Sequence, residues 1–351
     1  MTQQTLSPAP ALSAPRRTGD RLVVAKAPLR VSLAGGGTDL PSYADSFGGE
    51  VVSLAIDRYV CVSLYPRSFD RAVHASWEYT ETTPSADMLQ NRFGRAALLR
   101  HGVTNSLQVA SFADAPSGTG LGGSGAFTVA LLHALHLRGG GRPDRAALAE
   151  EASAVEMTDL GRVVGKHDHY MAALGGLRLL RIGKGGQVRA ENLPLTPALR
   201  DYFTNRLLLF YTGQSRDAGQ VLAAQARQTE SGQASTLEPL HVIRSLTGPM
   251  LEALRTGQVD RIGPLLREHW EAKTRLSDGV TTARVDQLYQ AALRSGADGG
   301  KLLGAGGGGF ILVSCRPGSQ GAVRAAMAEA DAPELAFGPE TAGTESSSLA
   351  L

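Results

Sequence analysis

Three glycine-rich stretches, spread over almost the whole chain, constrain its fold more than any other feature. They occupy residues 34–39, 117–125 and 304–309. Glycine costs a folded chain backbone entropy, so we expect such clusters where the backbone turns sharply or approaches a ligand closely. The middle stretch runs directly into residues 126–135, an apolar segment typical of a helix. Because the exposed N–H groups and the macrodipole at a helix start favour phosphate, we predict that the chain binds a phosphorylated nucleotide.

The composition excludes several classes of protein. The chain has 351 residues, of which 42% are hydrophobic, enough for one large or two ordinary domains with real cores. Its net charge of +2 is too small to indicate a nucleic-acid surface, so we expect no nucleic-acid partner. The sequence contains no run of about 18 apolar residues, and we therefore expect no membrane span.

The two cysteines, Cys61 and Cys315, lie in apolar strand-like runs and offer no disulfide framework. This usage is typical of a reducing compartment, so we expect a cytoplasmic protein. Residues 1–20 are rich in Pro, Ser and Ala and lack the apolar centre of a signal peptide, which predicts a disordered tail. The sequence leaves the choice between monomer and homodimer open.

Apolar patterning changes between strand and helix along the chain. The expected strands are 22–25, 30–34, 50–56, 59–64, 177–182, 206–211 and 310–314, and the expected helices are 126–137, 145–160, several between 219 and 295, and 321–330. Because strands gather first and helices later, the order favours an α+β fold. We expect an N-terminal domain at 21–200, a C-terminal domain at 201–340 and a frayed tail at 341–351.

Two familiar phosphate motifs do not account for the middle glycine stretch. The Gly-x4-Gly-Lys-Ser/Thr signature of P-loop proteins is absent from the sequence. Residues 118–123 match the Gly-x-Gly-x-x-Gly pattern of dinucleotide-binding domains, but that pattern requires a buried apolar strand directly before it. Here the preceding residues are Asp114-Ala115-Pro116-Ser117, which argues against a Rossmann-type site.

Four segments resemble the motifs of the GHMP small-molecule kinases. In chain order, residues 27–33 resemble the first motif of that family, 116–126 its phosphate loop, 165–168 with 175–176 its catalytic aspartate segment, and 301–310 its third motif. The likeness covers about residues 22–316. It implies ATP as the phosphate donor, an N-terminal half like the second domain of ribosomal protein S5, and a ferredoxin-like C-terminal half.

Within that family, the chain is most similar to the D-glycero-α-D-manno-heptose 7-phosphate kinases. The likeness rests on residues 30–41, on 48–49 with 56–57, and on 209–213 with 215–216. It implies phosphorylation of the anomeric hydroxyl of a heptose 7-phosphate to give the 1,7-bisphosphate. Two alternatives stay open: a fucokinase-like or galactokinase-like 1-kinase for an unphosphorylated sugar, and a catalytically silent sugar sensor.

The resemblance implies catalytic roles for Asp168 and Arg30. Asp168, which could otherwise cap a turn, matches the position that receives the proton of the sugar hydroxyl. Arg30, otherwise an ordinary strand-edge arginine, would face that hydroxyl and stabilise charge on the transferred group. Phosphoryl transfer needs little else beyond a placed nucleophile, an aligned phosphate and neutralised charge. His167 and His169 have no third partner at ligand spacing, so we expect no zinc site there.

The phosphate loop and two oxygen ligands are expected to hold ATP and Mg²⁺. Ser124 and Glu156 match the positions where the family binds Mg²⁺, a hard cation that prefers oxygen ligands. Without the resemblance, Ser124 is interpreted as a helix N-cap and Glu156 as a solvated residue of the helix 145–160. The residues expected to bind ATP are Pro116, Ser117, Gly118, Thr119, Gly120, Leu121, Gly122, Gly123, Ser124 and Gly125.

The first glycine stretch is expected to hold the sugar. Related galactokinases carry Glu and His at the positions of Gly36 and Gly37, so this chain lacks an anion there and has room for a longer sugar with a distal phosphate. A bare loop that only turns more tightly is the alternative. Arg216 and Arg67 are candidate partners of that phosphate, because arginine suits bidentate phosphate contacts. The residues expected to bind substrate are Gly35, Gly36, Gly37, Thr38, Asp39 (through a sugar hydroxyl), Lys166, Arg216, Gly306 and Gly307.

Overall fold

Two long antiparallel strands form the centre of the molecule. The computed structural model describes residues 21–215, 218–277 and 279–351, so the tail expected at 1–20 lies outside the described residues. β1 (Arg21–Ala34) pairs with β2 (Gly49–Pro66). The sequence predicts each of them as two short strands, but the pairing of β1 with β2 continues across a register shift between Pro28 and Leu29. A proline cannot donate to the ladder and is tolerated at such a bulge, so it interrupts the pattern without ending the strand.

The larger sheet has eight strands in the order β11-β1-β2-β5-β3-β4, with β6 paired to β2 and β7 to β6. Its neighbours are antiparallel except for β3 and β5, which run parallel. The remaining strands are β3 (Val73–Ser76), β4 (Thr80–Thr83), β5 (Leu107–Ala113), β6 (Leu177–Ile182), β7 (Val188–Leu193) and β11 (Glu345–Ala350).

The expectation of a frayed tail at 341–351 is wrong. β11 lies along β1, from the pair Arg21 and Ala350 to the pair Lys26 and Glu345. The Lys26 and Glu345 side chains also form an ion pair of 3.0 Å. A Ser-rich segment carries little apolar signal, but its backbone groups pair with a free strand edge as well as those of any other residue.

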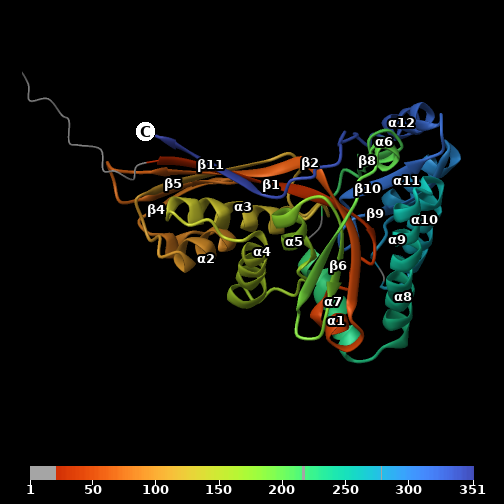
Figure 1. Cartoon of the computed structure of the whole chain (residues 1–351), viewed down its shortest axis with the longest axis horizontal. Helices are drawn as coiled ribbons and strands as arrows, with labels where there is room; N and C mark the ends of the chain where they lie inside the picture. The colour runs from red at the N-terminus through yellow and green to blue at the C-terminus, as the bar shows by residue number, and fades with distance from the viewer. Residues whose placement is uncertain (1–20, 216–217, 278) are drawn as a thin grey trace, which may run out of the picture.

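Helices of the first half cover one face of the larger sheet (Figure 1). α3 packs against β1 and β2 and is buried on almost all sides, as its apolar sequence requires. The helices of the first half are α1 (Pro41–Phe47), the 3₁₀ turn η1 (Ala86–Met88), α2 (Arg92–Arg100), α3 (Gly123–Arg138), α4 (Arg145–Ala154), the π turn η2 (Val155–Asp159), α5 (His167–Leu174) and α6 (Pro197–Asn205). Of these, α1 and α6 lie away from this face, next to elements of the second half.

The second half is built on a smaller antiparallel sheet, in the order β8-β10-β9. Its strands are β8 (Leu207–Tyr211), β9 (Ala297–Leu302) and β10 (Phe310–Cys315). Its helices are α7 (Ala218–Glu230), α8 (Ala234–Ser245), α9 (Thr247–Thr256), the turn η3 (Val259–Arg261), α10 (Ile262–Lys273), α11 (Ala283–Arg294) and α12 (Gln320–Glu329). Over the described residues, no helix has the length and apolar character needed to cross a bilayer.

The two halves share buried surface. α9 packs against β1 and β2, and α10 packs against both β9 and β1. Met250 and Leu266, from these two helices, belong to the same buried cluster as the core of the larger sheet. The boundary near residue 200 therefore stays a proposal, and β11 has to be counted with the N-terminal half.

Candidate active site

The middle glycine stretch forms a loop whose backbone N–H groups lead into α3. Gly118, Gly120 and Gly122 have φ of 70°, 85° and 78°, a left-handed conformation that favours glycine. Gly122 is the N-cap of α3 and supplies no side-chain cap, so the first amides of the helix are left for a ligand. The N-cap interpretation of Ser124 is wrong, because the helix begins one residue before it, at Gly123.

The third glycine stretch packs on this loop, backbone against backbone. A Cβ added to Gly304 would lie 2.5 Å from Cα of Gly120, and one added to Gly309 would overlap the carbonyl oxygen of Thr119. The amide of Phe310 also donates to the Thr119 carbonyl over 3.1 Å. These glycines hold the loop in place because no side chain fits between the two segments.

Arg30 and Asp168 meet beside the loop. Arg30 donates from Nε and Nη2 to Oδ1 of Asp168 over 2.8 and 2.5 Å, and from Nη1 to the carbonyl of Gly120 over 2.6 Å. None of the hydrogen bonds within the described residues ends on Asp168 Oδ2. Burial alone would raise the pKa of Asp168, but the charge and hydrogen bonds of Arg30, together with the neighbouring His167 and His169, outweigh burial and hold the pKa below its ordinary value. The carboxylate is therefore ionised at neutral pH, with one oxygen left to accept a proton.

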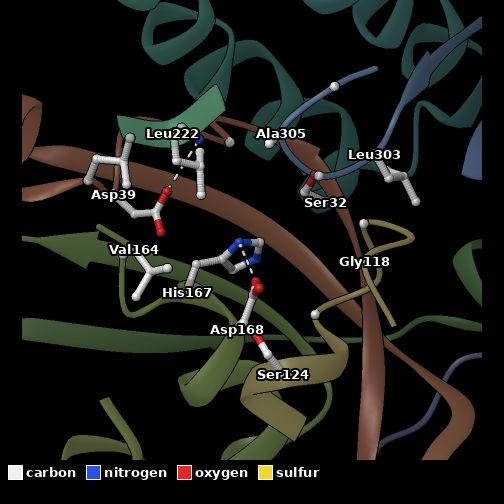
Figure 2. Close-up of a pocket in the computed structure, with 18 of the residues that line it drawn as sticks. Ser32, Asp39, Gly118, Ser124, Val164, His167, Asp168, Leu222, Leu303 and Ala305 are labelled. Atoms are coloured by element: carbon white, nitrogen blue, oxygen red, sulfur yellow. Dashed lines mark hydrogen bonds and ion pairs between the residues drawn. The ribbon is translucent and has the colours of Figure 1, made fainter. Parts of the chain in front are cut away.

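His167 lies between Asp39 and Asp168 in the cavity wall (Figure 2). Its Nδ1 is 3.4 Å from Oδ1 of Asp168. Burial, followed by the positive charge of Arg30, lowers the pKa of His167 to about 3, so the ring is neutral. Asp39 has a raised pKa, first because of burial and then because of the charge of Asp168.

These groups surround a cavity of about 460 Å³. The structure brings to its lining the following residues expected from the sequence: Arg30, Gly36, Gly37, Asp39, Ser117, Gly118, Gly120, Gly122, Gly123, Ser124, Glu156, Asp168 and Gly306. The phosphate loop, the first glycine stretch and the third glycine stretch therefore face one space (Figure 2).

Several predicted residues support the cavity without lining it. The hydroxyl of Thr38 donates to the carbonyls of Gly35 and Glu50, and a Cβ on Gly35 would overlap the Glu50 carbonyl. Gly125 packs against Asp168, where an added Cβ would lie 2.8 Å from Cβ of that residue. The same group includes Thr119, Leu121 and Gly307, which are buried. Pro116 is exposed and lines the second cavity described below.

Three predicted binding residues are not brought to the cavity. Lys166, the N-cap residue of α5, instead forms an ion pair of 2.6 Å with Glu150 on α4. Arg67 lies just beyond the end of β2 and pairs with Asp70 over 2.5 Å. The Lys166 and Arg67 expectations are therefore wrong for this cavity, and Arg216 lies outside the described residues.

Ser124 and Glu156 both line the cavity and fit a magnesium ion. Glu156 is not a solvated helix residue: α4 ends at Ala154 and Glu156 lies in the buried π turn η2. Its Oε2 pairs with Arg162 over 3.1 Å, whereas its Oε1, 3.3 Å from Nε2 of His169, has no hydrogen-bond partner in the described part of the chain. A buried carboxylate oxygen without a hydrogen bond, in a cavity that a serine hydroxyl also lines, suits a hard cation.

Sequence reasoning missed a second cavity of about 490 Å³ on the other side of the phosphate loop. Trp77 and Phe127 line it, and it shares Phe93, Ser117, Gly123 and Ser124 with the first cavity. Its residues come from separate strands, turns and helices, so no contiguous motif could have revealed it. An apolar pocket next to a phosphate-binding loop suits the base of a nucleotide.

Among the further cavity residues that received no role from the sequence, four are polar or charged side chains from β1, α10 and β9. They are Ser32 on β1, His269 and Lys273 on α10, and Lys301 on β9. Lys301 belongs to the third motif, but the sequence alone does not show that this charged side chain is buried.

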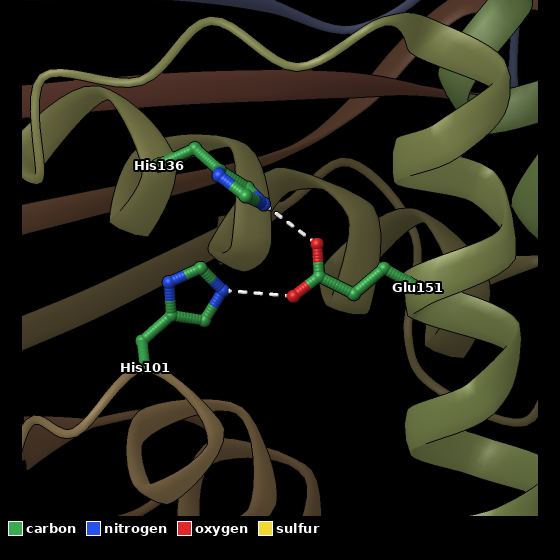
Figure 3. Close-up of side chains that lie close together, drawn as sticks. All are labelled: His101, His136 and Glu151. Carbon is green, nitrogen blue, oxygen red and sulfur yellow. Dashed lines mark hydrogen bonds and ion pairs between the residues drawn. The ribbon is translucent and has the colours of Figure 1, made fainter.

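A separate cluster joins three helices away from these cavities. His101 and His136 contact the two oxygens of Glu151 over 3.0 and 2.6 Å (Figure 3), and Arg100 approaches the same carboxylate to 3.7 Å. Among the described residues, these three side chains form the group of His, Cys, Asp or Glu whose ligand atoms lie close enough together to hold a metal ion. We interpret it as an ion-pair cluster that fastens α4 to α3 and to the end of α2.

Comparisons with known proteins agree with the motifs. The family model "GHMP kinases N terminal domain" matches residues 84–176, and "GHMP kinases C terminal" matches residues 250–332. The chain is 28% identical over 305 residues to a D-glycero-alpha-D-manno-heptose 7-phosphate kinase of Campylobacter jejuni, covering 83% of this chain and 88% of that one. It is 26% identical over 322 residues to a bifunctional fucokinase/GDP-fucose pyrophosphorylase of Arabidopsis thaliana, covering 85% of this chain but 30% of that protein.

Solved structures share the fold. A D-glycero-D-manno-heptose 1-phosphate kinase from Bacteroides thetaiotaomicron superposes with a TM-score of 0.77 at 23% identity, covering 94% of this chain and all of the other. Galactokinase of Lactococcus lactis gives a TM-score of 0.71 at 16% identity over 92% of this chain and 95% of the other.

Proposed function

Because this chain belongs to the GHMP kinases and is a sugar kinase, we propose that it transfers the γ-phosphoryl group of ATP to the anomeric hydroxyl of a heptose 7-phosphate. The α+β GHMP kinase architecture is confirmed by the family matches and by the structural neighbours. The acceptor and the position phosphorylated are the proposal.

The observation that carries the proposal is the Arg30 and Asp168 pair, placed between the phosphate loop and the first glycine stretch. Oδ2 of Asp168 accepts the proton of the attacking hydroxyl, while Oδ1 stays bound to Arg30. The oxygen of that hydroxyl attacks the γ-phosphorus and the bond to the β-phosphate oxygen breaks, leaving ADP. Arg30, held on the carbonyl of Gly120, keeps a positive charge beside the transferred group. Neutral His167 supports the pair without competing for the proton.

ATP is proposed to lie across the phosphate loop, with its phosphates on the amides that begin α3 and its base in the pocket lined by Trp77 and Phe127. Ser124 and Glu156 would hold Mg²⁺, which supplies charge neutralisation to the phosphates when bound. Both contribute oxygen ligands, and the buried Oε1 of Glu156 supports this assignment.

The acceptor is proposed to lie between Asp39 and the glycines at 36 and 37, where the cavity has space instead of side chains. The 28% identity to a heptose 7-phosphate kinase over most of both chains supports a heptose phosphate as the substrate. The fucokinase relative supports the second candidate, an unphosphorylated sugar.

A panel of sugars in a coupled ADP-release assay tests the proposal. We expect turnover of a D-glycero-D-manno-heptose 7-phosphate, with kcat/KM roughly 10- to 150-fold above that of the heptose without phosphate, because one charge-assisted contact is lost. The product should also lose its reducing end, because only phosphorylation at the anomeric carbon blocks ring opening. Faster turnover of fucose or galactose would favour the simple sugar 1-kinase, and sugar binding without ADP release would favour the sensor.

A further inference from the structure

Two buried lysines that the proposed reaction does not use lie in the wall of the cavity that contains Arg30 and Asp168. Lys273 is 6% exposed and Lys301 is 1% exposed. Within the described residues, the hydrogen-bond partners of both ammonium groups are neutral atoms. Burying a cation without a counter-charge is costly, so such groups are expected where a ligand brings the opposite charge.

Lys301 is the centre of a small set of donors. It donates to Oγ of Ser32 over 3.2 Å and to Nε2 of His269 over 3.3 Å. A protonated Lys301 can only donate, so in that state Nε2 of His269 accepts and the neutral ring carries its proton on Nδ1. That Nδ1 is buried and has no hydrogen-bond partner in the part of the chain that the structure describes. Lys301 and His269 therefore offer buried donor groups with no negative charge paired to them.

Basic groups gather at this end of the cavity, and without an anion their charged forms are disfavoured. Burial, and then the charge of Lys273, lowers the pKa of Lys301 well below its ordinary value, and burial lowers that of Lys273 to about 7. A bound phosphate would favour the protonated form of both lysines. Lys273 uses two of its three protons on the carbonyls of Leu302 and Gly304, which leaves one proton for a ligand. The carboxylates of the cavity are not hydrogen-bonded to these lysines: Asp168 is paired with Arg30, Glu156 is paired with Arg162, and Asp39 has a raised pKa.

The position of Ser32 connects this set to the acceptor. Arg30 and Ser32 are two residues apart on β1, so their side chains leave the same face about 6.6 Å apart. That separation is comparable with the span of a sugar ring. On the opposite side, a Cβ added to Gly36 would have Ser32 as its nearest neighbour, with Oγ 3.6 Å away. Such a Cβ would be in ordinary van der Waals contact with Ser32, so Gly36 lines the cavity close to this residue.

We propose that Lys301, Ser32 and His269 form the subsite for the distal phosphate of the sugar acceptor, with Lys273 adding positive charge beside it. This inference rests on the proposed function, because it assumes an acceptor that carries a phosphate at the end opposite to the reacting hydroxyl. It gives these residues the role that the sequence suggested for Arg67.

The test compares kcat/KM for a heptose 7-phosphate and for the same heptose without phosphate. In Lys301→Met, we expect the ratio of the two values to fall roughly 10- to 150-fold, the loss of one charge-assisted contact. Lys184→Met, at an exposed position outside the cavity, should leave the ratio at its wild-type value. If Lys301→Met lowers kcat/KM equally for both sugars, or for neither, the ratio stays unchanged and the subsite is overturned.

A second pair of variants does not depend on the folding of Lys301→Met. Gly36→Glu and Gly36→Gln have the same shape and differ in charge, and the backbone at Gly36 is not left-handed. We expect the ratio to be lower in Gly36→Glu than in Gly36→Gln, because only the carboxylate repels phosphate and pairs with Lys301. Equal ratios in the two variants would contradict the subsite.

The outcomes separate the two proposals. If the wild-type enzyme prefers the 7-phosphate and Lys301→Met keeps that preference, the subsite is wrong and the proposed function stands. If the wild-type enzyme does not distinguish the two sugars, both the phosphate acceptor and its subsite are rejected.

Discussion

Asp168 Oδ1 receives two hydrogen bonds from Arg30, of 2.8 and 2.5 Å, across 138 residues of sequence. The pair keeps the carboxylate ionised and turns its other oxygen to the cavity. It also joins the larger sheet, through β1, to the first turn of α5.

Asp168→Asn should lower kcat by about 10²–10⁴-fold, because an amide cannot accept the proton of the sugar hydroxyl. ATP affinity, measured by titration calorimetry, should change little, since the variant keeps the shape of the side chain. Asp260→Asn removes a carboxylate that pairs with Arg206 far from the cavity and serves as the control. A variant at position 168 with more than about a tenth of the wild-type kcat would remove the base role from Asp168.

Gly122→Val should abolish nucleotide binding while the protein stays folded. A Cβ at this position would lie 3.3 Å from Arg30 Cγ and from Asp168 Cγ, and the left-handed backbone is strained for a β-branched residue. Gly257→Val is the matched control, since Gly257 is also left-handed but has open space around it. Circular dichroism and a nucleotide titration check both variants, and a normal titration in Gly122→Val would place the phosphates elsewhere.

Glu156→Gln should raise the Mg²⁺ concentration needed for half-maximal activity by roughly 10- to 150-fold, the effect of losing a charged ligand. Nucleotide binding without Mg²⁺ should stay close to that of the wild type. Glu150→Gln, which changes a carboxylate bonded to Lys166 and Tyr170, is the control. If the two variants have the same Mg²⁺ dependence, Glu156 is not a ligand.

Glu151→Gln should destabilise the protein at neutral pH and lose that effect in acid. Burial by itself raises the pKa of Glu151, but the hydrogen bonds from His101 and His136 outweigh burial and lower the pKa from 4.5 to about 2. A carboxyl whose pKa is lower in the folded state stabilises fully above its unfolded pKa, and the contribution disappears as the pH falls from about 4.5 towards 2.

Urea unfolding midpoints of the wild type and of Glu151→Gln at pH 7, 5, 4 and 3 measure this effect. Glu238→Gln, at an exposed position, should follow the wild type throughout. A difference between the wild type and Glu151→Gln that stays constant down to pH 3 would contradict the role of the carboxylate charge.

Strong local patterns made much of the fold predictable. The strand predicted at 177–182 is β6, and the predicted helix at 126–137 lies within α3, because each has a continuous apolar pattern. The sequence did not predict β11 or the π turn that carries Glu156. β11 is Ser-rich and forms only because β1 offers it an edge, and the π turn is a small departure from a helical pattern that continues through it.

The sequence by itself determined the family, the α+β class and the segments that meet at the cavity, because glycine loops and strand patterns are local signals. Only the tertiary structure decided which side chains face that cavity. It turned Lys166 towards Glu150 and placed Lys301 on Ser32, 269 residues away. Such contacts depend on the register of strands and on the packing of helices from distant segments. A buried lysine and an exposed one look the same in a sequence, and only packing shows which of them lacks a counter-charge.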